Sequence, residues 1–309
     1  MIIHEGYENL NLIQPVVTIG VFDGVHMGHR AVLEQLVNLA RLTKGESVVI
    51  TFNPHPRLVL GEKTDELYYL STLEEKKKLL AETLIDHLVI IKFDTYLRNM
   101  EALDFIREIL VREIGIKHLI VGYDNHFGKN KTGDLEKISR YAGLFDFAVG
   151  QGREISSPEG VISSTSIRDA LLKGHVENAN RLLGYCYSLT GTVIQGRKLG
   201  RSLGFPTANM KPDDNHKLIP ANGVYAVDIM LDNKKLTGML SVGFNPTVNK
   251  SKGQKSIEVH IFDFDRDLYG LSITLFFRFR LRDEKKFESI KQLSQQMALD
   301  KDTAMRLLS

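Results

Sequence analysis

The first half of the chain alternates unbroken apolar runs of strand length with segments of helical period. The apolar runs are Val16–Ile19, Ser47–Phe52, His87–Phe93, Lys117–Val121 and Phe145–Val149. A Val- and Ile-rich run without polar alternation is typical of a strand that is covered on both faces, and intervening helices favour parallel pairing. The sequence therefore predicts an α/β, Rossmann-like domain with a parallel sheet between two layers of helices.

The segments between these runs have apolar residues at helical spacing. Ser71-x-x-Glu74 has the spacing of a capping box and predicts a helix from about Leu73. Lys76, Lys77 and Lys78 follow in that helix, and such a run of like charges is typical of a solvated face. The other expected helices cover residues 28–42, a segment through Phe105, Ile109 and Leu110, residues 135–141, and a short stretch within 161–174.

The second half has a different pattern, in which short strand-like runs are separated by Gly, Pro, Asn and Asp. Several short strands with turn signals predict a small antiparallel barrel or sandwich. An apolar stripe predicts a last helix from Phe287 to about Leu308. The strand-like runs are Gly191–Val193, Val224–Met230, Leu236–Val242, Ser256–Phe262 and Ser272–Phe279.

Charge divides the 309-residue chain at the same place. Residues 1–184 have a net charge of −4 and residues 185–309 a net charge of +6, within a total of +2. We therefore expect two domains, 1–184 and 185–309, each long enough to bury its own core. The basic residues of the second half form no continuous stripe interleaved with aromatics, so the pattern favours phosphate ligands over nucleic acid.

Other global features exclude several classes of protein. No apolar run approaches the roughly 18 residues of a membrane span, and the N-terminal stretch lacks the basic region of a secretory signal. Cys186 is the only cysteine, which rules out an intrachain disulfide and a four-thiolate zinc site. We expect a cytoplasmic protein with small-molecule partners, without nucleic acid or membrane, whose oligomeric state the sequence leaves open.

The segment Gly20–His29 leaves the first strand and opens the first helix, which is where open parallel sheets bind ligands. Free amides at the helix start favour an anion, Gly28 permits close backbone approach, and His26 and His29 lie three residues apart. A cationic or hydrogen-bonding imidazole pair there would stabilise charge on a transferred phosphoryl group. A metal-binding pair and purely structural histidines are the alternatives.

Gly20–His29 resembles the H-x-G-H signature of the nucleotidyltransferase superfamily, whose members bind ATP or CTP at this turn and release pyrophosphate. Segments 51–56, 121–128 and 163–168 follow in the order and spacing of the FMN adenylyltransferase module of bacterial bifunctional FAD synthetases. The resemblance implies His26 and His29 as catalytic residues. It also implies that ATP is bound by Gly20, Phe22, Gly28, Ser164, Thr165 and Arg168, and flavin by Asn53, His55 and Asp124.

Some of these residues have an interpretation of their own. Ser164, Thr165 and Arg168 lie at an expected helix start, where hydroxyls, free amides and a guanidinium form a phosphate cradle. A Ser/Thr cap with a surface arginine is the alternative. Asn53 and His55 lie on a stiff, proline-flanked loop after a strand, and without the other motifs that loop would be interpreted as a turn.

The second half carries its own signature in residues 191–209, which are dense in glycine and end in a Pro-Thr-Ala-Asn step. Such a loop lets backbone amides wrap phosphate, and a hydroxyl beside an amide carbonyl offers hard oxygen ligands for Mg²⁺. The segment resembles the riboflavin kinase module of the same family. The resemblance implies Thr207 and Asn209 for the metal, Gly196, Gly200 and Arg201 for phosphate, Glu258 as catalytic base and Arg282 for flavin.

By its pattern alone, Glu258 lies on the polar face of a strand, and a solvated glutamate is the alternative. The family resemblance implies an enzyme that uses ATP and Mg²⁺ to convert riboflavin to FMN and FMN to FAD. The hydroxyl of riboflavin is a weak acid and needs a base, whereas the phosphate of FMN is already an anionic nucleophile. A chain with one working module and a non-catalytic flavin or nucleotide sensor are the competing hypotheses.

Overall fold

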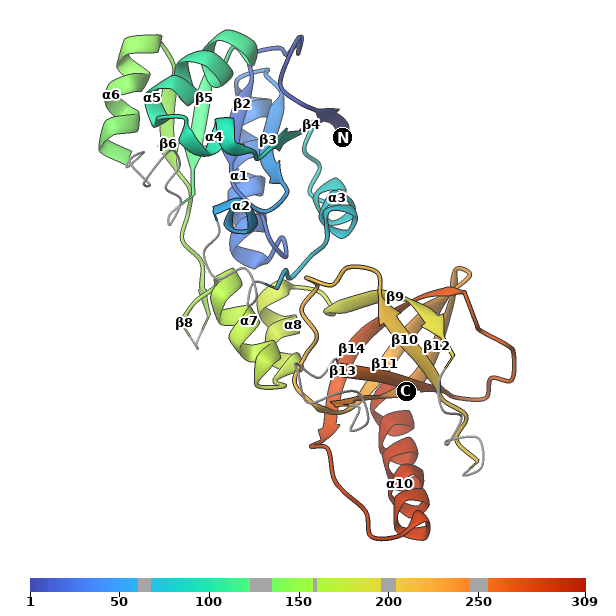
Figure 1. Ribbon diagram of the computed structural model, residues 1–309. Helices are drawn as coiled ribbons and strands as arrows, with labels where there is room; N and C mark the ends of the chain where they lie inside the picture. The colour runs from blue at the N-terminus through green and yellow to red at the C-terminus, as the bar shows by residue number, and fades with distance from the viewer. Residues whose placement is uncertain (61–67, 123–134, 158–159, 196–203, 245–254) are drawn as a thin grey trace. The chain divides into compact units, whose positions relative to one another are not determined.

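The computed structural model describes residues 1–60, 68–122, 135–157, 160–195, 204–244 and 255–309 (Figure 1). Its internal contacts divide the chain into two compact units, Met1–Ser163 and Ser164–Ser309. The expected domain boundary between residues 184 and 185 stays a prediction. Within the described ranges, no helix is both long and apolar enough to cross a lipid bilayer.

A six-stranded parallel sheet forms the centre of the first unit, in the order β1-β4-β3-β2-β5-β6, which confirms the predicted fold (Figure 1). Its strands are β1(Ile2–Glu5), β2(Val16–Ile19), β3(Ser47–Asn53), β4(His87–Lys92), β5(His118–Val121) and β6(Ala148–Gln151). The helices are α1(Met27–Leu42), α2(Pro56–Leu60), α3(Leu73–Ala81), α4(Thr95–Asn99), α5(Ala102–Asp104), the π-helical η2(Phe105–Glu113) and α6(Leu135–Phe145). A short hairpin, β7(Ser156–Ser157) and β8(Gly160–Val161), completes the unit.

Alternate residues of the strands enter two separate apolar cores, one on each face of the sheet. Val17 and Val48 pack with residues of η2 and α6, while Val16 and Val49 pack with residues of α1 and α3. Successive side chains of a strand point to opposite faces, so a strand that is covered on both faces needs apolar residues at every position. This double burial explains the unbroken apolar runs in the sequence.

Two local expectations for the first unit were wrong. Phe145 ends α6 and does not begin a strand, because its side chain packs on the same core as that helix. The capping box of α3 is Thr72 with Glu75, whose amide donates to the Thr72 hydroxyl (3.3 Å) while its carboxylate accepts from the Thr72 amide (2.9 Å). The hydroxyl of Ser71 instead accepts a hydrogen bond from the Gly24 amide (2.9 Å).

The second unit contains a closed antiparallel barrel in the order β10-β13-β12-β11-β14-β9, as the sequence pattern predicted. Its strands are β9(Ser188–Ile194), β10(Ala208–Pro212), β11(Gly223–Leu231), β12(Lys234–Phe244), β13(Lys255–Ile261) and β14(Ser272–Arg282). Its helices are α7(Ser164–Leu172), α8(Val176–Leu183) and α10(Ile290–Leu308), with α10 capped by Ser289 (Figure 1).

Asn180 attaches α8 to the barrel. Its side-chain Nδ2 donates to the carbonyl of Phe277 on β14 (2.7 Å), and its Oδ1 accepts from the amide of Tyr187 (2.7 Å). Because both ends of the amide are used, the helix is fixed to the strand and to the segment that enters β9. These bonds explain why α8 belongs to the same compact unit as the barrel.

Candidate active sites

A tight turn joins the carboxyl end of β2 to the start of α1. Phe22, Gly24 and Val25 all have positive φ angles, of 50°, 81° and 37°. This conformation is unfavourable for residues with a side chain, above all for a β-branched one, and persists only where surrounding contacts enforce it. The contacts around this turn must therefore hold it in a conformation that its residues would not adopt alone.

Asp23 provides the main contacts that hold the turn. Its side chain is almost fully buried, and its carboxylate accepts hydrogen bonds from the amides of Leu70 (3.0 and 3.1 Å) and Ser71 (3.0 Å). A buried carboxylate is stable only with such donors. The turn is thereby fixed to the segment that precedes α3, a role that the sequence analysis did not assign to Asp23 or Ser71.

His26 and His29 form a stacked pair at the start of α1. His26 is the N-cap, and its Nδ1 accepts from the backbone amide of His29 (3.3 Å). The ring centroids are 3.6 Å apart with an interplanar angle of 18°, and the Phe22 ring meets His29 edge-on at 5.1 Å. A Cβ at Gly28 would lie 3.2 Å from the His26 ring and 3.3 Å from the carbonyl of Ile162, so a larger residue there would have to displace these neighbours by a few tenths of an ångström.

The electrostatics of the pair favour an uncharged His29. Burial is the main cause that lowers the pKa of His29 well below its usual value, and His26 and Lys76 lower the pKa further. A buried ring nitrogen, Nδ1 of His29, has no hydrogen-bond partner among the described residues. The structure thus brings together Phe22, His26, Gly28 and His29, whose roles in catalysis and ATP binding stay predictions.

Lys76 is buried, which contradicts the expectation that Lys76, Lys77 and Lys78 form a solvated face. Only 6% of Lys76 is exposed, and its Nζ lies 3.5 Å from the hydroxyl of Thr51 on β3. The helical period directs one lysine of the run inward, while Lys78 remains exposed. Burial lowers the pKa of Lys76 to about 8, although the nearby carboxylate of Asp23 acts in the opposite direction.

Asn53 and His55 lie at the carboxyl end of β3, the neighbour of β2, and hence at the same edge of the sheet as the turn. The carbonyl of Asn53 accepts from the amide of Phe93 (3.0 Å). The ring of His55 is stacked on Tyr69 at 5.9 Å, one residue before the segment that Asp23 holds. The predicted flavin-binding residue Asp124 lies outside the described residues.

Ser164, Thr165 and Arg168 belong to α7 in the second unit, with the two hydroxyl residues in its first turn. A helix start with backbone amides and hydroxyls, followed by a guanidinium one turn later, has the kinds of group that bind phosphate. Their assignment to ATP stays a prediction.

Glu258 lies in a row of polar side chains that crosses the barrel. In the strand register it is opposite Asn209 of β10 on one side and Ser241 of β12 on the other, and directly opposite residues share a face of the sheet. The hydroxyl of Thr207 lies 3.5 Å from Oε2 of Glu258. The structure therefore brings the predicted base and the predicted metal ligands together.

His260 fixes the segment that carries Thr207. Its Nδ1 lies 2.8 Å from the carbonyl of Pro206, and its ring meets Phe205 edge-on at 5.4 Å. The contact holds the residue before Thr207 against β13, two positions along the strand from Glu258. Sequence analysis did not single out this histidine, since it lies outside the matching motif residues.

The oxygen donors in this row suit Mg²⁺. Among the described residues, no group of three or more His, Cys, Asp or Glu side chains could hold a metal. A hydroxyl from Thr207, an amide carbonyl from Asn209 and the Glu258 carboxylate are hard oxygen donors, and Mg²⁺ in proteins takes few such ligands alongside substrate phosphates and water. Gly196, Gly200 and Arg201, the predicted phosphate-binding residues, lie outside the described residues.

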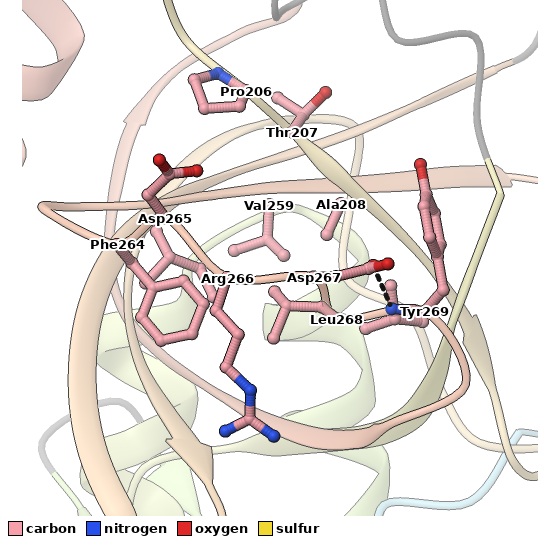
Figure 2. Close-up of a pocket in the computed structure, with 12 residues that line it drawn as sticks. Pro206, Thr207, Ala208, Val259, Phe264, Asp265, Arg266, Asp267, Leu268 and Tyr269 are labelled. Atoms are coloured by element: carbon pink, nitrogen blue, oxygen red, sulfur yellow. Dashed lines mark hydrogen bonds between the residues drawn. The ribbon is translucent and has the colours of Figure 1, made fainter.

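A pocket of about 320 Å³ adjoins this row (Figure 2). Val193, Val259, Ile261 and Leu268 provide apolar walls, and Thr207 is part of its lining. Residues 265–267 form a polar rim, and Tyr269 lines the pocket next to them. The amide of Tyr269 donates to the carboxylate of Asp267 (3.1 Å; Figure 2). Thr207 therefore belongs both to the lining of the pocket and to the contact with Glu258.

Arg282 lies at the end of β14 and forms a buried ion pair with Asp300 of α10. Its Nε is 3.0 Å from both carboxylate oxygens and its Nη2 is 2.7 Å from one of them. Gln296 adds a further hydrogen bond to Asp300 (2.9 Å). The guanidinium thus connects barrel and helix, and its predicted contact with flavin stays a prediction.

Comparison with known proteins assigns both halves. The FAD synthetase family model matches residues 9–166, and the riboflavin kinase family model matches residues 183–308. A bifunctional riboflavin kinase/FMN adenylyltransferase from Listeria monocytogenes is 37% identical over 93% of this chain and 90% of its own. The proteins of the same name from Escherichia coli K12 and Bacillus subtilis are 36% and 34% identical over 94% and 95% of this chain, and 91% and 92% of theirs.

A crystal structure from Streptococcus pneumoniae, which carries the name macrolide-efflux protein, has the same fold. It superposes with a TM-score of 0.88 at 31% identity and covers 98% of both chains. Its name differs from those of the curated relatives and concerns that protein alone. With both family models matched in sequence order and relatives of this identity over nearly the full length, the chain belongs to the family of bifunctional riboflavin kinase/FMN adenylyltransferases.

Proposed function

We propose that the barrel half phosphorylates riboflavin to FMN and that the parallel-sheet half adenylylates FMN to FAD with release of pyrophosphate, with ATP as the donor in both reactions. The observation that supports this proposal most directly is that the Thr207 hydroxyl lies within 3.5 Å of the Glu258 carboxylate, beside a pocket of about 320 Å³.

In the kinase half, Glu258 acts as the general base. It accepts the proton of the terminal ribityl hydroxyl while the oxygen attacks the γ-phosphorus of ATP and the bond to the bridging oxygen of ADP breaks. Such a hydroxyl is a very weak acid, so a positioned carboxylate is the group that the step requires. The adjoining pocket, with its apolar walls and polar rim, would hold the adenosine of ATP, and Arg282 would contact the flavin.

Thr207 and Asn209 would hold Mg²⁺ in this half, and Gly196, Gly200 and Arg201 would contact the phosphates of ATP. When bound, the ion would neutralise the charge of the phosphates. Glu258 is opposite Asn209 in the strand register, so the base and the proposed ligands keep their spacing through the rigid barrel. The contact between His260 and the Pro206 carbonyl supports that spacing.

In the adenylyltransferase half, the phosphate of FMN attacks the α-phosphorus of ATP without a general base, because its second pKa of about 6 leaves it anionic at neutral pH. His26 and His29 would stabilise the charge that develops on the transferred group. Ser164, Thr165 and Arg168 would bind the departing pyrophosphate. The other proposed contacts are Gly20, Phe22 and Gly28 for ATP, and Asn53, His55 and Asp124 for flavin.

We also propose that the protein works in the cytoplasm on flavins and ATP, without a nucleic-acid or membrane partner. Both proposed reactions consume ATP, and the chain carries a net charge of only +2. A balance so close to neutral gives little electrostatic attraction to a polyanionic partner.

The experiment is a chromatographic time course of the purified chain with riboflavin, excess ATP and Mg²⁺. The proposal expects FMN to rise first and then to be converted to FAD, and it expects both products to disappear when Mg²⁺ is chelated. A second reaction that starts from FMN isolates the adenylyltransferase half. FMN that accumulates without FAD would leave only the kinase, and binding of flavin without either product would favour the sensor.

A further inference from the structure

Lys76 of α3 is linked through Thr51 to the turn that carries the histidine pair. Its ammonium approaches the hydroxyl of Thr51 at 3.5 Å, and that hydroxyl donates to the carbonyl of Val21 (3.1 Å). Val21 precedes Phe22, whose ring packs against His29 at 5.1 Å. A continuous path of contacts therefore joins the lysine to the histidine through β3 and the turn.

The geometry of the histidine pair does not suit two cations. Because Nδ1 of His26 accepts a hydrogen bond from the His29 amide, this nitrogen carries no proton in the observed arrangement. Rings stacked at 3.6 Å would also place two positive charges almost in contact. A neutral His26 that accepts through Nδ1 carries its proton on Nε2, where it is a hydrogen-bond donor.

The charged groups around His29 reinforce this state. His26 and Lys76 are the two titratable neighbours that lower the pKa of His29, in addition to burial. Lys76 in turn faces the carboxylate of Asp23, which favours its charged form. Its neighbour on α3, Lys77, is directed elsewhere and forms ion pairs with Glu5 and Glu74. Below about pH 8, Lys76 therefore carries a buried positive charge in this region, beside the carboxylate of Asp23.

We propose that Lys76 is a positioning residue of the adenylyltransferase site, whose buried ammonium supplies the positive charge behind the histidine pair and keeps His29 in its uncharged, hydrogen-bonding form. This inference rests on the proposed function of that half. The transferred adenylyl group then meets neutral imidazole rings, and the charge that attracts its negative oxygens lies behind those rings, on Lys76. A buried charge acts on the site through a low dielectric and is little screened by salt.

The test compares Lys76→Met and Lys76→Arg with the wild-type chain and with Lys78→Met, a matched control on the exposed side of the same helix. The conversion of FMN to FAD is followed as kcat and KM between about pH 5.5 and 9.5. Phosphorylation of riboflavin by the same samples normalises the amount of active chain.

In the wild type, kcat should fall above about pH 8 as Lys76 loses its proton. Lys76→Arg should abolish this alkaline decrease, since a guanidinium remains charged throughout the range. Lys76→Met should lower kcat by about tenfold and move the acid limb upward, because one of the three causes that lower the pKa of His29 is then removed. Lys78→Met should reproduce the wild-type profile.

A second measurement follows the protonation of the histidine rings directly, and its wild-type arm does not depend on any variant being well folded. NMR titration of the histidine rings in the wild-type chain should show His29 uncharged at pH 6.5 and below, with a higher pKa in Lys76→Met. A His29 that is protonated at pH 6.5 in the wild type overturns the proposal, as does a Lys76→Met enzyme with the wild-type pH profile. Absence of FAD formation by the wild type at every pH would instead overturn the proposed function.

Discussion

At the scale of single residues, His29 determines how the first unit responds to acid. Its pKa in the folded chain lies well below that of a free imidazole, chiefly because of burial. Below about pH 6.5, where an unfolded chain binds this proton, the folded chain does not, so protons favour unfolding. The contribution of His29 to stability is therefore complete above pH 6.5 and is lost as the pH falls toward its folded value.

We expect the free energy of unfolding of the first unit to decrease by at most about 1.4 kcal/mol per pH unit from this group as the pH falls from 6.5. His29→Asn should remove that part of the slope. The measurement is urea unfolding of the wild type and the variant at several pH values between about 5 and 7. Equal slopes in the two proteins would show that His29 titrates alike in the folded and unfolded chains.

At the scale of elements, the start of α3 depends on Thr72. Its hydroxyl and the carboxylate of Glu75 satisfy each other's backbone amides. Thr72→Ala should cost about 1 kcal/mol in urea unfolding, because one amide of the first turn loses its acceptor. Thr72→Ser, which keeps the hydroxyl, is the matched control and should stay close to the wild type. If the alanine and serine variants are equally stable, the cap does not support the helix.

The attachment of α10 to the barrel depends on the buried pair of Arg282 and Asp300. Asp300→Ala leaves the guanidinium without its partner and should lower the free energy of unfolding of the second unit by about 3–5 kcal/mol. Lys301→Ala removes a neighbouring, more exposed pair with Asp263 and should cost at most about 1 kcal/mol.

The double variant Arg282→Met with Asp300→Leu provides the sharper measurement. Removal of both charges should recover most of the loss, since no unpaired charge then remains buried. A double variant as unstable as Asp300→Ala would mean that packing of the two side chains, and not their charge, supports α10. Urea unfolding followed by a probe of the second unit distinguishes these outcomes.

Sequence alone predicted elements with a strong period and missed those without one. The starts of β2 and α3 agree with expectation, and α1 begins one residue earlier than expected. A continuous apolar run marks β2, whereas a capping signal marks α3, although the capping residue is Thr72 and not Ser71. Strand β10, Ala208–Pro212, was missed because it is short and contains no β-branched residue, and β1 because it is an exposed strand at the edge of the sheet. These strands form because they pair with strands that are distant in the sequence, and a local sequence pattern does not show such pairing.

The same limit applies to the sites. Motif residues such as His26, His29, Thr207 and Glu258 could be selected from spacing and resemblance, and the structure brings each pair together. Lys76 was misjudged, since a run of three lysines has the composition of a surface and only tertiary packing shows which one turns inward. Supporting contacts come from segments remote in sequence and cannot be read from motif spacing.

At the scale of the whole molecule, two independent sites predict complementation between damaged chains. His29→Ala should form FMN but no FAD, and Glu258→Gln should convert supplied FMN to FAD but not phosphorylate riboflavin. Neither variant alone should make FAD from riboflavin, whereas an equimolar mixture should, because FMN leaves one chain and binds to another. Chromatography of the mixture, with each variant alone at the same total concentration as control, measures this. Loss of both activities through either substitution would contradict separate sites.

The closure of the barrel also limits how this protein can associate with other chains. In a closed ring of strands each member is paired on both sides, as β9 is with β10 and β14. No row of backbone donors and acceptors is left there to template an incoming strand, whereas the open sheet of the first unit ends in β1 and β6. Among the strands that the structure describes, association by strand addition would therefore have to begin at β1, at β6 or at the short hairpin β7–β8.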